Sequence, residues 1–75
     1  MKEPIDYLST LFVGIDIAAR THVVSALDFN QEFFIKMKSV PNTQQGAQLL
    51  ENMVADVLAE NHQFKYVVIS MESTG

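Results

Sequence analysis

The sequence predicts an α/β fold in which three strands, one helix and a fourth strand follow one another along the chain. Residues 11–17, LFVGIDI, form a nearly continuous apolar run, which is typical of a strand buried on both faces. Two more strand-like segments follow after short turns, and residues 43–61 then carry apolar side chains at helical spacing. A last apolar run, residues 64–72, completes the order β-β-β-α-β.

Length and composition restrict the class of protein. The chain has 75 residues, 48% hydrophobic and 19% charged, which indicates one folded domain at most rather than a disordered segment. It has no cysteine, which excludes disulfide scaffolds and cysteine-based zinc sites. No run approaches the roughly 18 apolar residues of a membrane span. We therefore expect a cytoplasmic protein with no membrane partner.

The net charge limits any role with nucleic acid. Nine acidic residues outnumber five basic ones, giving a formal net charge of -4, and the basic residues are scattered. Phosphate neutralisation requires clustered Lys and Arg. A nucleic-acid role therefore depends on metal ions held by acids, or on basic surface supplied from elsewhere.

The first two strands are predicted after a short N-terminal arm. Residues 1–10 are expected to form this arm, and residues 11–75 the folded part. The first strand, residues 11–17, contains one anomaly, the acidic Asp16. A short link leads into the second strand, residues 21–29, and Asn30 indicates a tight turn because it tolerates a left-handed backbone.

The third predicted strand covers residues 32–40. Its alternation places Phe33, Ile35 and Met37 on one face, with Lys36 and Lys38 on the other. Such a pattern is typical of a half-solvated edge strand protected by lysines.

The helix and the last strand follow Pro41, which is predicted to stop the third strand. Thr43 is a candidate N-cap for a helix that runs to about Asn61. The helix has one apolar face, formed by Leu50, Met53, Val54, Val57 and Leu58. The last strand, residues 64–72, is apolar on both faces and is therefore expected to be central.

These connections predict a mixed sheet with the strand order third, second, first, fourth, and one helix on one face. Two hairpins are followed by one helical crossover, and such crossovers are right-handed in nearly all proteins. The first and fourth strands are then parallel neighbours. Because one helix covers only one face and the edge of the last strand is open, we also expect self-association, in the form of a dimer across that edge or that face.

Two acids are predicted to meet at the carboxyl end of this parallel pair. Asp16 and Glu72 each end the series of side chains on one face of their strand, where ligand sites of α/β sheets collect. Two such carboxylates repel unless a cation or a shared proton separates them, and Mg²⁺ prefers oxygen ligands. The alternative is that both acids simply meet solvent or cap the next turn. His22 and His62 are interpreted as packing or surface residues, and Arg20 as a solvated loop residue.

Two short motifs resemble those of a known family. The segment Gly14-Ile15-Asp16, together with Glu72-Ser73-Thr74-Gly75, is similar to the N-terminal region of the DEDD-type insertion-sequence transposases, which include the Piv-type DNA invertases. The likeness covers roughly residues 12–75. It implies a RuvC-like catalytic domain with a ribonuclease H-like fold, in which Asp16 and Glu72 are catalytic acids that bind Mg²⁺ or Mn²⁺.

The resemblance also implies a function and partners. Members of the family cut and rejoin DNA at insertion-sequence ends and targets, and some use a structured guide RNA. Their remaining acids, an Asp-x-x-Asp pair, and a domain with a nucleophilic serine would lie beyond residue 75. We therefore expect an N-terminal fragment of the catalytic domain, inactive alone, from a prokaryotic protein that is nucleoid-associated when active.

Two other classes of protein stay open at the level of sequence. Actin-like and sugar-kinase ATPase lobes share the starting topology and a strand-end aspartate, but they usually continue with a glycine-rich phosphate loop. Here Ala18-Ala19-Arg20 stands in that place. The other alternative is a small interaction module whose acids have no catalytic role.

Overall fold

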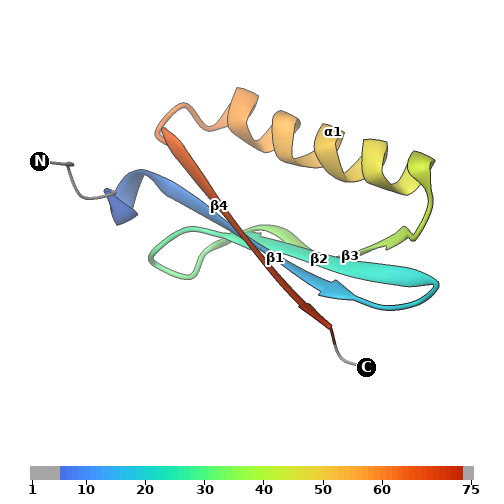
Figure 1. Ribbon diagram of the computed structural model, residues 1–75. Helices are drawn as coiled ribbons and strands as arrows, with labels where there is room; N and C mark the ends of the chain where they lie inside the picture. Colours follow the sequence, from blue (N-terminus) through green and yellow to red (C-terminus); the bar gives the residue numbers. More distant parts are fainter. Residues whose placement is uncertain (1–5, 74–75) are drawn as a thin grey trace, which may run out of the picture.

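A four-stranded mixed sheet covered on one face by a helix makes up the structure (Figure 1). The computed structural model describes residues 6–73. Its elements are, in chain order, the short 3-10 helix η1 (Tyr7–Ser9), β1 (Thr10–Ile17), β2 (Thr21–Leu27), β3 (Phe33–Pro41), α1 (Gln44–Glu60) and β4 (Tyr66–Ser73). The predicted order β-β-β-α-β is confirmed, with strand ends that differ from the prediction by one or two residues.

The strand order across the sheet is β3-β2-β1-β4, as predicted. β2 is antiparallel to both β1 and β3, whereas β4 runs parallel to β1. The parallel pair requires the crossover that α1 provides, and Figure 1 shows α1 on one side of the sheet.

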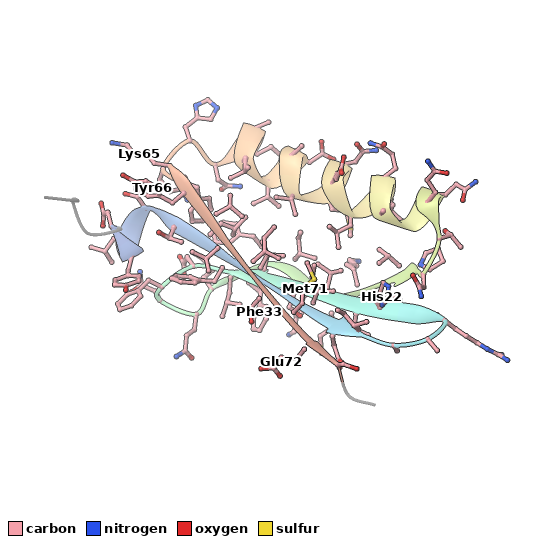
Figure 2. All side chains as sticks on the ribbon, viewed as in Figure 1. His22, Phe33, Lys65, Tyr66, Met71 and Glu72 are labelled. Atoms are coloured by element: carbon pink, nitrogen blue, oxygen red, sulfur yellow. The ribbon has the colours of Figure 1, made fainter. Side chains whose placement is uncertain are left out.

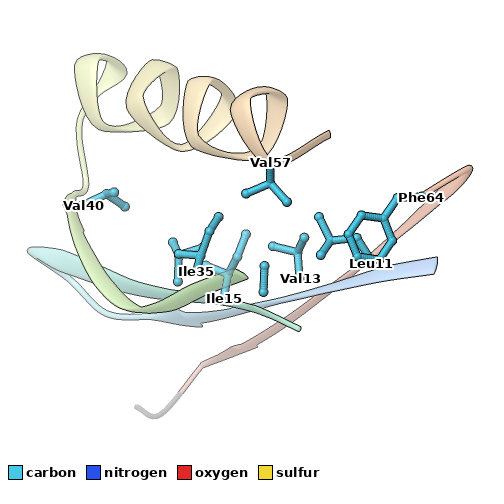
Figure 3. Close-up of a cluster of buried hydrophobic side chains, with 9 residues drawn as sticks. Leu11, Val13, Ile15, Ile35, Val40, Val57 and Phe64 are labelled. Atoms are coloured by element: carbon cyan, nitrogen blue, oxygen red, sulfur yellow. The ribbon is translucent and has the colours of Figure 1, made fainter. Parts of the chain in front are cut away.

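The hydrophobic core lies between α1 and the sheet (Figure 3). It consists of nine buried side chains: Leu11, Val13, Ile15, Val24, Ala26, Ile35, Val40, Val57 and Phe64. Alternate residues of β1 enter this core, while the residues between them face the uncovered side of the sheet. Each fully buried Val, Leu or Ile stabilises the fold by about 1.5–3 kcal/mol, so the helix-facing side supplies most of the stability.

The start of α1 is defined by a cap and a close backbone approach. The Thr43 side chain accepts a hydrogen bond from the Gly46 N–H at 3.0 Å, which confirms the predicted N-cap. Gly46 lies directly against the carbonyl oxygen of Pro41, so a side chain at this position would collide with the backbone. At the other end, the Asn61 N–H donates to the Val57 carbonyl oxygen at 2.9 Å.

The β2–β3 connection is held by Asp28. Its side chain accepts a hydrogen bond from the Glu32 N–H at 2.9 Å, and its carbonyl oxygen accepts one from the Gln31 N–H at 3.0 Å. The residue with left-handed backbone is Gln31, with φ of 67°, and not Asn30 as its residue type suggested.

The predicted alternation of β3 is wrong. Ile35 is buried, whereas Phe33 is 48% and Met37 69% exposed. The pairing with β2 shifts register on both sides of Ala26, and each irregularity adds a residue to β3 and reverses the faces that follow. Met37 accordingly has a positive φ of 49°. Phe33 and Met37 therefore lie on the uncovered face, opposite to Ile35.

The prediction that the last strand is central and buried on both faces is also wrong. β4 lies at the edge of the sheet and pairs with β1 alone, and all eight of its residues are exposed. α1 packs against β3 at the opposite edge, which leaves β4 outside the covered area. The apolar run that indicated a buried strand is thus a surface feature of this chain.

The N-terminal segment packs through aromatic stacking. The Tyr7 ring stacks on Phe12 and Phe29, with centroid distances of 6.3 and 5.9 Å. Residues 1–5 of the expected arm lie outside the described part of the chain. Within residues 6–73, no helix has the length and apolar character needed to cross a membrane.

The Pro41–Gly46 approach generates a stability prediction. Gly46→Ala should lower the free energy of unfolding by about 1–3 kcal/mol, because the added methyl group displaces the start of α1 from the end of β3. Gly14→Ala is the matched control, since a Cβ at Gly14 meets no atom within 4 Å. Urea unfolding of the three chains measures the difference, and a Gly46→Ala chain as stable as the wild type would contradict it.

Candidate active site

The two acids singled out from the sequence are neighbours in the sheet. Asp16 near the end of β1 and Glu72 near the end of β4 are direct partners in the parallel register. Paired strands lie about 4.8 Å apart, so both side chains leave the backbone next to each other. Both are exposed and lie on the face opposite α1, and Figure 2 shows Glu72 pointing away from the helix.

A shallow hollow of about 490 Å³ lies on the uncovered face around the two acids. All four strands contribute to its lining, which includes Asp16, Glu72, Gly14, Ser25, Ser70, Phe33 and Met37. The acids thus occupy the wall of an open concavity and are accessible to a large ligand.

The floor of this hollow is low because of a row of small residues. Gly14 lies two residues before Asp16 on β1. It pairs with Ser25 of β2 on one side and with Ser70 of β4 on the other. No atom lies within 4 Å of the position that a Gly14 Cβ would take. Sequence reasoning did not identify Ser25, because only the strand register shows that it lies beside Gly14.

The electrostatics of the acid pair favour a cation. Two adjacent carboxylates on the same face repel, and a positive ion between them removes that cost. Among the residues that the structure describes, no group of three or more His, Cys, Asp or Glu side chains gathers as a ligand set. Mg²⁺ commonly uses only one or two carboxylates and retains water or phosphate oxygens, so the donor set of Asp16 and Glu72 fits it.

The other polar candidates do not join the acids. His22 Nδ1 accepts a hydrogen bond from the Ala18 N–H at 3.1 Å across the β1–β2 turn, and His22 lies beside Val40 on the helix side of the sheet. His62 contacts the Ala59 carbonyl oxygen at 2.7 Å at the end of α1. Arg20 is exposed in the β1–β2 turn. These positions agree with their interpretation as packing and surface residues.

The sheet order β3-β2-β1-β4, the single crossover helix and the acids at the ends of β1 and β4 define the class of this domain. It is an α/β domain of the ribonuclease H-like type with the element order β-β-β-α-β.

A comparison with family models identifies the family. The model of the IS110-type DEDD transposases, described as "Transposase", matches residues 13–75. Since this match covers most of the chain, the chain belongs to that family of insertion-sequence transposases. Searches of curated proteins and of solved structures gave no match. The family match argues against the actin-like and sugar-kinase alternative.

The acid pair generates a prediction that is independent of metal. Without divalent cations, Asp16→Asn and Glu72→Gln should each raise the free energy of unfolding, because each removes the repulsion between the two carboxylates. The double variant should gain little over either single one. Thermal unfolding at low salt measures this coupling, which should fade at about 1 M salt. Asp56→Asn on α1 is the control, and fully additive effects of the two substitutions would contradict the coupling.

Proposed function

We propose that this chain supplies the first two acids of the metal-binding active site of a DNA transposase that cuts and rejoins phosphodiesters. The observation that carries the proposal is the register pairing of Asp16 with Glu72 inside the segment matched by the transposase family. Two adjacent carboxylates on an open face are suited to hold a divalent cation that a DNA phosphate also contacts.

Each part of the hollow has a role in this proposal. Asp16 and Glu72 would hold Mg²⁺ or Mn²⁺ on the uncovered face of the sheet. Bound there, the cation would supply the positive charge that polarises a phosphate and stabilises the attacking and leaving oxygens of a displacement. The low floor at Gly14, between Ser25 and Ser70, gives a bulky phosphodiester backbone room to approach the acids.

The complete reaction requires groups that these 75 residues do not contain. The sequence has no Asp-x-x-Asp motif, the form in which the family resemblance implies the other two acids. We therefore propose that the chain alone does not cleave DNA, and that a cleavage-competent site contains two further acids and a nucleophilic serine. Its proposed partners are insertion-sequence ends and target DNA, with a guide RNA as in some family members, in the cytoplasm of a prokaryote.

Metal binding tests the proposed centre directly. The chain should bind Mn²⁺, and Asp16→Asn and Glu72→Gln should each weaken binding by about tenfold or more, because each removes one of two charged ligands. Electron paramagnetic resonance of free Mn²⁺ measures the affinity. Asp56→Asn, which alters an acid on α1, is the matched control. Equal Mn²⁺ binding by all four chains would contradict the centre.

We also propose that two copies of the chain pair through β4. Its exposed residues include five large apolar ones, Tyr66, Val67, Val68, Ile69 and Met71. β4 contains no Lys or Pro, the residues that commonly protect an edge strand, and its outer edge leaves backbone N–H and C=O groups free for a further strand. Antiparallel pairing centred on Ile69 would place Val67 of one copy opposite Met71 of the other, on the same face.

Sedimentation over a series of concentrations tests this pairing. The wild-type chain should form a dimer, and Ile69→Lys should shift it to monomer, because it places two like charges at the centre of the interface. Leu49→Lys is the matched control, since Leu49 is a similarly exposed apolar residue on α1. A monomeric wild-type chain, or an Ile69→Lys chain that still dimerises, would exclude the β4 interface.

A further inference from the structure

The irregular pairing of β3 brings two large apolar side chains to the hollow that contains the acid pair. Phe33 and Met37 line the same hollow as Asp16 and Glu72, on the face opposite the core. Figure 2 shows that Phe33 and Glu72 both lie on the side of the sheet away from α1. Regular alternation would have placed Phe33 on the same face as the buried Ile35. The register shifts instead present an aromatic ring to solvent in the hollow that the acids also line.

A positive charge accompanies this ring. The Lys36 Nζ lies 5.8 Å from the centroid of the Phe33 ring. Lys38, also exposed, follows on β3, where it pairs with Val24. β3 thus holds two of the five basic residues of an otherwise acidic chain. An exposed aromatic face next to a flexible cation is complementary to a nucleotide, which combines a flat base with a negative phosphate.

We propose that Phe33 stacks on one unpaired base of the DNA strand whose phosphate a cation at Asp16 and Glu72 would contact, and that Lys36 binds a phosphate next to that base. The inference rests on the proposed function and adds that the DNA is unpaired where it meets the site. Bases in an intact duplex already stack on their neighbours and show only their edges in the grooves. The exposed ring therefore selects DNA that is single-stranded or opened at this position.

The rest of the site is consistent with this arrangement. The base takes the place of Lys36 over the ring, and Lys36 turns to the adjacent phosphate, where its charge offsets part of the repulsion from the two acids. Met37, 69% exposed on the same rim, supplies an adaptable apolar contact for the edge of the base. The small residue Ser25 lies between β3 and Gly14, so the path from the ring to the acids is not obstructed.

The test uses a short single-stranded oligonucleotide that carries 2-aminopurine, whose fluorescence falls when it stacks. Titrations in EDTA at low salt exclude metal-dependent effects, and a parallel series in an Asp16→Asn, Glu72→Gln background removes the acid repulsion. The wild-type chain should quench the probe and bind it more tightly than the matching duplex. Phe33→Ala and Phe33→Leu should weaken binding by about 5- to 150-fold. Phe33→Tyr, which keeps an aromatic ring at this position, should bind the oligonucleotide about as tightly as the wild-type chain.

Phe29→Ala is the matched control. Phe29 is a similarly exposed aromatic residue on the β2–β3 connection, but its ring stacks on Tyr7, and it does not line the hollow. Absence of quenching in both backgrounds, equal binding by Phe33→Leu, or a preference for duplex would overturn the stacking role. Because Mn²⁺ binding is measured without DNA, the proposed metal centre and the proposed stacking on Phe33 are tested independently of each other. Loss of the stacking result leaves the metal centre standing, and loss of Mn²⁺ binding leaves a Phe33-dependent base site.

Discussion

The parallel pairing of β1 with β4 is the constraint on which the rest of the structure depends. It joins Thr10–Ile17 to Tyr66–Ser73 over its whole length. Parallel neighbours require a long connection, and α1 supplies it while covering the helix-facing side of the sheet. The Lys65 N–H donates to the Ser9 carbonyl oxygen at 2.7 Å, just before the pairing begins. From that starting point, register alone brings Asp16 and Glu72 together at the other end.

This arrangement places the hydrophobic core on one face of the sheet and the acid pair on the other. Leu11, Val13 and Ile15 of β1 point into the core under α1, where burial stabilises the fold. The residues between them, Gly14 and Asp16, face an uncovered surface where a small residue and a charge cost little stability. Because that surface is open to solvent, the repulsion between the two carboxylates is a modest energetic cost.

The uncovered surface also accounts for the unusual edges of the sheet. β4 exposes both faces and one backbone edge because α1 packs over β3 at the opposite side. β3 departs from regular alternation because its register with β2 shifts on both sides of Ala26, and Phe33 and Met37 leave the core side as a result. Thus the open face carries exposed apolar groups on both edge strands, Phe33 and Met37 on β3 and Val68 on β4, in addition to the two acids.

The sequence by itself determined the order of the elements, the strand order, the cap at Thr43 and the pairing of Asp16 with Glu72. These features depend on local signals, namely apolar periodicity, capping residues and the direction of a crossover. Only the tertiary structure decided that β4 is exposed, that Phe33 and Met37 line the same hollow as the acids, and that Gly46 must lack a side chain. The reason is physical. The apolar residues of a strand are the same whether or not another element covers that strand. A β-bulge moves the following side chains to the opposite face of the sheet, and the residue types alone do not show where it occurs.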